Sequence, residues 1–203
     1  MSKPPLAKLI IKSVTMMEGA SVRQFRESYM AAQHAIAQLG DPVLRQIADP
    51  IYDVHADWVQ TLIDDLLLTL HQSNGVGIAA PQVSKPHRLL IVASHPNARY
   101  PNAPHMEPTP MINPRIIDHS DRTVKDWEGC LSVPGIRGLV PRYDEVTVTY
   151  TDRHNKQQTQ TLTGFVARIF QHEFDHLEGK VFVDHVEAST DLMTDQEYLK
   201  RCT

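Results

Sequence analysis

The chain has 203 residues, of which 41% are hydrophobic, and it carries a formal net charge of −4 at pH 7. This length predicts one domain, and the apolar content is sufficient for a substantial core. The mild negative charge gives no basis for direct nucleic-acid binding or for attraction to an anionic membrane. The sequence contains no apolar run of about 18 residues, so we expect no membrane-spanning helix.

Residues 1–20 contain only a short apolar stretch that is interrupted by lysine. They lack the long apolar segment of a secretion signal and the arginine-rich composition of a transit peptide. The two cysteines, Cys130 and Cys202, are too few for a disulfide framework, which favours a reducing compartment. We therefore expect a protein of a reducing cytoplasm, with an organelle as the alternative if the chain is a processed precursor.

The amino-terminal part of the chain predicts two helices. Residues 21–40 have an amphipathic pattern that ends at Gly40. Residues 55–75 have apolar positions three and four apart, and Asn74-Gly75 ends this second helix. Two Asp-Pro pairs lie between the helices and indicate an extended loop.

Short runs typical of β-strands follow. They cover residues 87–94, 110–117, 144–152 and 156–164. The last two runs alternate in polarity, which predicts a hairpin. A helix over 163–179 comes next, with Thr163 as its cap and Gly179 as its end, and residues from Ala188 onward favour a final short helix. The fold class is therefore α+β, with mostly antiparallel strands packed around a central helix.

The helix predicted over 163–179 carries the sequence QHEFDH at residues 171–176. At about 100° per residue, His172 and His176 lie about 40° apart on its apolar face, which also carries Glu173. The polar residues on the opposite face are Arg168, Gln171, Asp175 and Glu178. Three ionisable groups that point into a core are costly unless they are satisfied, and one metal ion satisfies them together. The His-Glu-x-x-His spacing therefore predicts a metal site.

A catalytic metal site needs a third protein ligand, and the sequence leaves several candidates. Asp184, His185 and Glu187 lie downstream, as the third ligand does in a zincin-like endopeptidase. Cys130 lies upstream in WEGCLSVPG, where small and turn-forming neighbours indicate close approach of the backbone to a ligand. A domain that binds a metal or a peptide without catalysis is a further alternative.

The stretch GVGIAAPQ at residues 75–82 matches the glycine fingerprint of dinucleotide-binding proteins. That fingerprint requires a strand before it and a helix after it. Here a helix is predicted before it and Pro81 follows, so this interpretation is rejected. The glycines instead indicate a backbone that a ligand can approach closely, and Gln82 offers an amide donor beside it.

Three blocks therefore occur in the order GVGIAAPQ, EGCLSVP and QHEFDHLEG. They resemble the three signature motifs of the peptide deformylase family, G-x-G-x-A-A-x-Q, E-G-C-x-S and H-E-x-D-H, at every fixed position. The segments LGDPVLRQIADPI and RGLVPRY add to this resemblance, which covers residues 37–187 as the expected catalytic domain. Residues 1–36 are then a partly helical extension, and residues 188–203 are a tail with a short helix.

The resemblance implies hydrolysis of the N-formyl group from the N-formylmethionyl ends of newly made polypeptides, which gives formate and a free amine. It implies a metal held by Cys130, His172 and His176, with Fe(II) as the native metal and zinc, nickel or cobalt in purified forms. The expected partners are nascent peptides, with a transient contact to the ribosome. No nucleic-acid binding and no membrane attachment are expected.

The resemblance also gives roles to residues around the metal. Glu173 takes a proton from the attacking water and passes it to the amine. The Gln82 side chain and the Leu131 N–H stabilise the oxyanion on the formyl oxygen. The substrate-binding positions are Val76, Gly77, Gly129 and Arg137.

Two further carboxylates near the predicted metal have supporting roles. Glu128 is a candidate hydrogen-bond acceptor for a histidine ligand. Asp175 faces away from the metal and is expected to pair with a cation such as Arg142.

Overall fold

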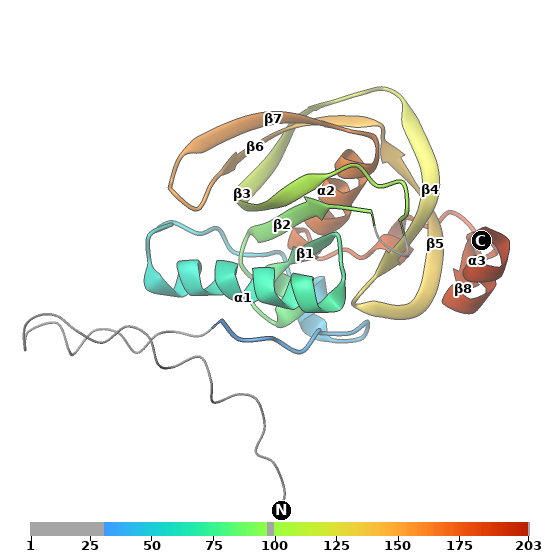
Figure 1. The fold of residues 1–203 in the computed structure, drawn as a ribbon, viewed down its shortest axis with the longest axis horizontal. Helices are drawn as coiled ribbons and strands as arrows, with labels where there is room; N and C mark the ends of the chain where they lie inside the picture. Colours follow the sequence, from blue (N-terminus) through green and yellow to red (C-terminus); the bar gives the residue numbers. More distant parts are fainter. Residues whose placement is uncertain (1–30, 97–99, 203) are drawn as a thin grey trace, which may run out of the picture. The chain divides into compact units, whose positions relative to one another are not determined.

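The computed structural model describes residues 31–96 and 100–202 (Figure 1). The helices are α1 (Asp57–Ser73), α2 (Gly164–Leu177) and α3 (Asp195–Cys202). The strands are β1 (Gly77–Ala79), β2 (Leu89–Ser94), β3 (Met106–His119), β4 (Thr123–Cys130), β5 (Val133–Tyr143), β6 (Glu145–Thr151), β7 (Gln157–Thr163) and β8 (Leu192–Thr194). Short 3-10 helices cover Pro42–Arg45, Ala80–Val83, Phe182–His185 and Ser189–Asp191. Among the described residues, no helix is both long and apolar enough to cross a membrane.

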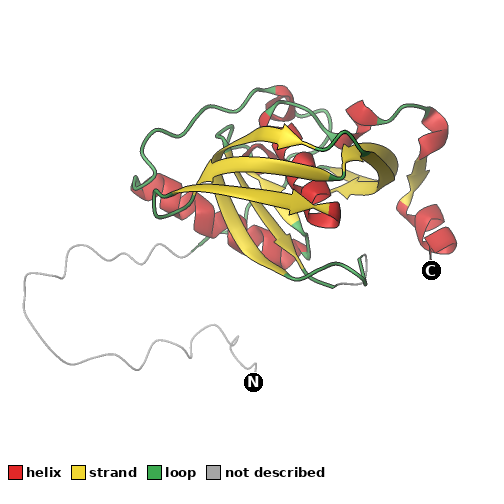
Figure 2. Ribbon diagram, turned by 90° about the horizontal axis from the view of Figure 1, so that it is seen from above, coloured by secondary structure: helices red, strands yellow, loops and turns green. Residues whose placement is uncertain are grey.

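The strands form two antiparallel sheets (Figure 2, strands in yellow). Five strands pair in the order β1-β2-β3-β6-β7, and three strands pair in the order β4-β5-β8. Helix α2 packs against β1 and β2 of the larger sheet and also contacts β5 of the smaller one. The predicted α+β fold, with antiparallel strands around a central helix, is confirmed.

Strand β2 shows how the larger sheet is covered on both faces. All of its residues are buried, and successive side chains of a strand point to opposite faces. Leu89 and Ile91 pack in one apolar cluster with residues of α1. Leu90 and Val92 pack in a second cluster with residues of α2. The sheet is therefore a layer between α1 and α2, and this layer fixes the position of α2.

Most elements expected from the sequence are present. Helix α1 corresponds to the helix predicted over 55–75, and Asn74 ends it in the left-handed conformation with φ 51°. Strands β2, β6 and β7 lie within three of the predicted strands, and β3 extends beyond the fourth at both ends. Strands β6 and β7 pair as the expected hairpin. The short helix expected after Ala188 is α3.

Helix α2 also lies where the sequence predicts it. Thr163 occupies the cap position, but its side chain makes no capping hydrogen bond. The polar face of the helix is covered by protein, since Arg168 and Gln171 are both buried. Gln171 accepts a hydrogen bond from the Tyr143 N–H (3.0 Å) and donates one to the Tyr143 carbonyl (2.9 Å). The helix is thus held by polar contacts on one side and by apolar contacts on the other.

The prediction of an amphipathic helix over residues 21–40 is wrong for residues 31–40, which contain no helix. The Ala37 N–H donates to the Gln82 carbonyl (2.8 Å), and the Leu39 N–H donates to the Ser132 carbonyl (2.7 Å). These bonds to distant segments take the place of the local bonds that a helix would make. The rest of that expected helix lies outside the described residues.

Strands β4 and β5 are not predicted from the sequence pattern. They form a hairpin whose two strands are joined at Leu131 and Ser132. Their sequence mixes glycine, proline and charged residues, which individually disfavour strands. Pairing of β5 with both β4 and β8 therefore stabilises a segment whose local propensity is weak.

Candidate metal centre

The three predicted metal ligands come together at the end of β4 and on one face of α2. Cys130 is the last residue of β4, and His172 and His176 lie one turn apart on α2. Their ligand atoms all lie within 4.8 Å of one another, and the Cys130 Sγ is 3.3 Å from the His176 Nε2. In the part of the chain that the structure describes, no other group of three such residues is placed to hold a metal.

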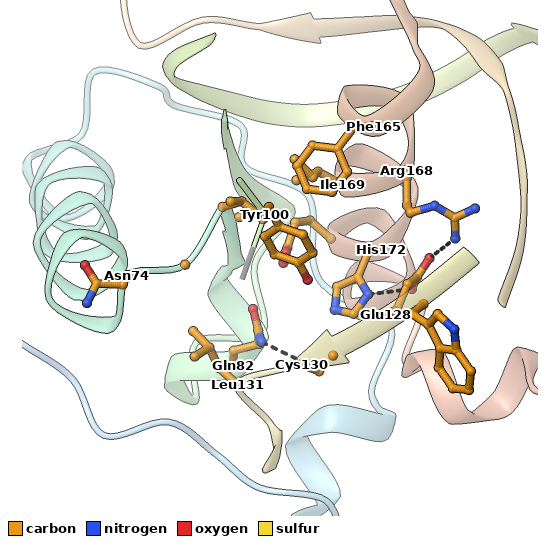
Figure 3. Close-up of a pocket in the computed structure, with 16 residues that line it drawn as sticks. Asn74, Gln82, Tyr100, Glu128, Cys130, Leu131, Phe165, Arg168, Ile169 and His172 are labelled. Carbon is orange, nitrogen blue, oxygen red and sulfur yellow. Dashed lines mark hydrogen bonds and ion pairs between the residues drawn. The ribbon is translucent and has the colours of Figure 1, made fainter. Parts of the chain in front are cut away.

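The ring of His172 is oriented by a buried carboxylate. Its Nδ1 lies 2.8 Å from the Glu128 Oε2, which leaves Nε2 to face the other ligand atoms (Figure 3). Arg142 donates two hydrogen bonds to the Glu128 carboxylate (2.9 and 3.0 Å), and Arg168 donates a third (2.8 Å). Burial alone would raise the pKa of Glu128, but the His172 hydrogen bond and the Arg142 charge hold that pKa below its usual range. The supporting role expected for Glu128 is therefore present.

The charge network continues through Arg142 to Asp175. The Arg142 Nη1 donates to the Asp175 Oδ2 at 2.6 Å, as the sequence analysis expects. The charge of Glu128 raises the pKa of Arg142 despite the opposing effect of burial, so this guanidinium is permanently charged. Two arginines and two carboxylates thus form a connected charge network behind His172.

The residues present fit a divalent metal ion. One thiol and two imidazoles supply three donors, which is the number that catalytic sites use when one position stays open. The Glu173 Oε2 is buried and has no hydrogen-bond partner among the described residues. Such an unpaired polar atom is costly in a core, and a polar ligand bound beside the cluster would offset this cost.

Glu173 lies against Gly77, the first residue of strand β1. Its side chain is buried, and a Cβ atom at Gly77 would lie only 2.5 Å from its Oε1. Because of this short distance, only glycine at position 77 allows β1 to approach the carboxylate so closely. Burial raises the pKa of Glu173 to about 7, although the nearby His172 and His176 oppose this shift.

The Gln82 side chain is fixed so that its donor end faces the metal site. Its Oε1 accepts a hydrogen bond from the Ala79 N–H (2.9 Å). This bond sets the orientation of the amide and directs Nε2 to the Cys130 Sγ (3.4 Å) and the Ser132 Oγ (3.2 Å). Leu131, the other expected oxyanion residue, lies in the connection between β4 and β5, next to Cys130.

A pocket opens beside the three ligands (Figure 3). Its lining includes the predicted residues Val76, Gly77, Gln82, Gly129, Cys130, Leu131, His172 and Glu173. It also includes Tyr100, Trp127, Phe165 and Ile169, which are not among the site residues predicted from the sequence. Of these, Phe165 and Ile169 carried a usable signal, because they lie about two helical turns and one helical turn before His172 on the same apolar face.

Arg137 is the one predicted substrate-binding residue that does not line this pocket. It lies behind Gly129, where a Cβ atom would be 2.8 Å from the Arg137 Cζ. It lines a neighbouring hollow instead, together with Leu131 and Asp195. Any effect of Arg137 on a ligand in the main pocket is therefore exerted through its neighbours.

The alternative third ligands are wrong. Asp184 forms an ion pair with Arg45 and accepts a hydrogen bond from the Val181 N–H (2.9 Å). The His185 Nε2 lies 3.0 Å from the Asp175 Oδ2. The Glu187 Oε2 binds the Lys125 Nζ (2.7 Å). None of these three residues belongs to the cluster of ligand atoms, so the zincin-like arrangement with a structural Cys130 is excluded.

The α+β fold, and a site that joins Cys130 of β4 to the two histidines of the His-Glu-x-x-His helix α2, define a metal-dependent hydrolase. A family model described as Polypeptide deformylase matches residues 33–191. Peptide deformylase 2 of Nostoc sp. is 59% identical over 168 residues, which cover 83% of this chain and 94% of that relative. Peptide deformylase 2 of Shewanella oneidensis is 43% identical over 162 residues, covering 80% and 89% of the two chains.

Solved structures give the same result. The crystal structure of a class I type b peptide deformylase from Acinetobacter baumannii, bound to Met-Ala-Ser, matches with a TM-score of 0.76 and 42% identity. This match covers 77% of the present chain and 100% of that one. A peptide deformylase from Thermotoga maritima matches with a TM-score of 0.68 and 32% identity, covering 77% and 99% of the two chains. The chain belongs to the polypeptide deformylase family, and its activity is that of a peptide deformylase.

Proposed function

We propose that this protein removes the formyl group from N-formylmethionyl ends of newly made polypeptides, with Fe(II) as the native metal. The observation that carries the proposal is the cluster of ligand atoms from Cys130, His172 and His176. It lies beside a pocket that Cys130, His172, Gln82 and Glu173 line. One thiolate beside two imidazoles is a softer donor set than a purely nitrogen and oxygen site, which suits Fe(II). Zinc, nickel and cobalt are the alternatives.

A divalent metal, when bound, supplies the Lewis acidity that makes hydroxide available at neutral pH and polarises the formyl carbonyl. Glu173 is adjacent in sequence to His172 and lies on the buried face of α2. We assign it the proton transfer, from the attacking water to the leaving nitrogen. Among the described residues, no hydrogen-bond partner occupies its Oε2, which leaves that oxygen available for this proton.

Gln82 and Leu131 are assigned to the negative charge that develops on the formyl oxygen. The Ala79 N–H fixes the Gln82 amide, so its Nε2 is directed to the site before substrate arrives. A donor that is already oriented needs no reorganisation during the reaction. The Leu131 N–H follows the Cys130 ligand directly and is the second donor in this assignment.

The pocket is assigned to the methionine side chain. Val76, Gly77 and Gly129 line it with small or apolar surface, and Phe165 and Ile169 extend this surface. Such a lining favours an unbranched apolar side chain. The related A. baumannii deformylase binds Met-Ala-Ser, a peptide that begins with methionine.

Residues 37–187 are proposed as the catalytic domain, with residues 1–36 as an extension and residues 188–203 as a tail. Because formylated chains leave the ribosome, we place the activity in the bacterial cytoplasm, with an organelle as the alternative. A transient contact with the ribosome is part of this proposal.

Hydrolysis of formyl-Met-Ala-Ser, measured by the release of formate, tests the function directly. The anaerobically purified protein, loaded in turn with iron, cobalt, nickel or zinc, should cleave this peptide much faster than formyl-Asp-Ala-Ser or acetyl-Met-Ala-Ser. Similar kcat/KM values for the three peptides would reject the formylmethionine assignment. A zinc form that is faster than the iron form would reject Fe(II) as the native metal.

A further inference from the structure

The carboxyl-terminal segment returns to the hairpin that carries the metal-binding cysteine. Strand β8 pairs antiparallel with β5 and places Met193 opposite Arg137. Figure 1 shows β8 and α3 beside β5. This pairing brings Asp195, the first residue of α3, to the guanidinium of Arg137, where its Oδ1 accepts a hydrogen bond from Nε at 2.7 Å.

Arg137 is almost fully enclosed, since only 6% of its side chain is exposed. A buried guanidinium is costly unless its charge and its N–H groups are satisfied. Among the described residues, Asp195 supplies the one carboxylate that pairs with it. The Tyr198 ring of α3 lies 5.0 Å from the Arg137 Cζ, a favourable contact between a cation and an aromatic face. Both contacts that α3 makes with Arg137 therefore hold its side chain in one place.

Arg137 in turn contacts two walls of the pocket. Its guanidinium lies against Gly129, next to the Cys130 ligand, so closely that a Cβ atom there would be 2.8 Å from Cζ. Its Nη1 donates to the Tyr100 hydroxyl at 3.3 Å, and the Tyr100 ring lies 4.8 Å from the Phe165 ring. Figure 3 shows Tyr100 and Phe165 at the pocket. Arg137 thus supports two walls without lining the pocket itself.

A second contact links α3 to the same pocket. The Trp127 ring, which lines the pocket, meets the Tyr198 ring edge-on at 5.9 Å. The other end of the carboxyl-terminal segment is attached differently. There Lys125 binds Glu187 (2.7 Å) and Asp191 (2.8 Å), and none of these three residues lines the pocket.

We propose that Asp195 is a positioning residue for the substrate. By holding Arg137, it fixes the Gly129 and Tyr100 walls, so the carboxyl-terminal segment sets how well the first side chain of the peptide fits. The inference rests on the proposed assignment of this pocket to the formylated methionine. Asp195 does not touch the reacting atoms, so its loss affects substrate binding more than the chemical step.

The test is steady-state hydrolysis of formyl-Met-Ala-Ser by the full-length, metal-loaded protein and its Asp195→Asn variant. We expect KM to rise on the order of tenfold, with kcat within about twofold of the parent. The Asp195 side chain is 45% exposed, so the variant should fold and melt as the parent does. The matched control is Asp191→Asn, which removes an ion pair from the same segment and should leave KM within about twofold of the parent.

A double-substitution series separates positioning from general loosening of the segment. In an Arg137→Met background, Asp195→Asn should have no further effect on KM, because the proposed role acts only through Arg137. An unchanged KM in Asp195→Asn, an equal rise in Asp191→Asn, or independent effects in the double variant would each overturn the inference. A parent protein that does not cleave the peptide would instead overturn the proposed function.

Discussion

Replacing Glu128 with glutamine would remove the buried negative charge around which the metal centre is organised. The Glu128 carboxylate is 4% exposed and bonds to His172, Arg142 and Arg168 at 2.8 to 3.0 Å. Removing one partner of a buried ion pair costs about 3–5 kcal/mol, because the other charge stays buried. In the variant, Arg142 still has its hydrogen bond to Asp175 (2.6 Å), and Arg168 still has its hydrogen bonds to backbone carbonyls. We therefore expect a loss of unfolding free energy at the lower end of this range, about 3 kcal/mol.

The free energy of unfolding should be measured on metal-free protein, so that lost metal binding does not contribute to it. For a chain of this length, a loss of about 3 kcal/mol corresponds to a decrease in Tm of about 6–12 °C. In a separate titration, the Glu128→Gln variant should bind the metal about 10–100-fold more weakly. The reason is that His172 loses the carboxylate that orients its ring.

The matched control is Glu178→Gln. It removes a single ion pair with Arg88 (2.7 Å) in which the carboxylate side chain is 34% exposed, so solvent screens the charge. Its unfolding free energy should change by no more than about 1 kcal/mol, and its metal affinity should not change. If Glu128→Gln also changes the unfolding free energy by no more than about 1 kcal/mol, or binds the metal as tightly as the parent, the reasoning from buried charge is refuted.

Three further outcomes follow from the site. Glu173→Gln should lower kcat on the order of 10²-fold at full metal content, and a near-normal kcat would show that it is not the proton carrier. Gly77→Ala should displace the Glu173 carboxylate, because the added Cβ would lie 2.5 Å from Oε1. This displacement should reduce kcat on the order of 10²-fold. An active variant whose crystal structure shows Glu173 unmoved would contradict this expectation. Cys130→Asp should depress deformylation even where metal content persists, and anomalous diffraction on the parent should place the metal within about 2.5 Å of the Cys130 sulfur.

Local periodicity is sufficient to determine the helical part of the site. The spacing of His172 and His176 places both rings on one face of α2 wherever that helix packs, and Glu173 follows on the buried side. The strand β2 is equally local, because an apolar run bounded by turn residues has few alternatives. These features depend on residues close together in the chain, so the sequence predicts them directly.

The third metal ligand depends on tertiary structure. From the residues alone, Cys130 competes with Asp184, His185 and Glu187, and only the resemblance to a family selects the cysteine. The structure excludes the other three because Asp184 pairs with Arg45, His185 lies beside Asp175 and Glu187 binds Lys125. Such pairings join residues far apart in the chain, and no periodic pattern encodes them.

Residues 31–40 and the hairpin of β4 and β5 show the same limit for the fold. The first segment has a helical pattern but gives its N–H groups to Gln82 and Ser132, and the hairpin has weak strand propensity but pairs with β8. The sequence by itself therefore determined the metal-binding helix, the chemistry of its ligands and the strands with strong propensity. Only the tertiary structure decided which distant groups complete the site, because long-range hydrogen bonds and buried ion pairs outweigh local preferences.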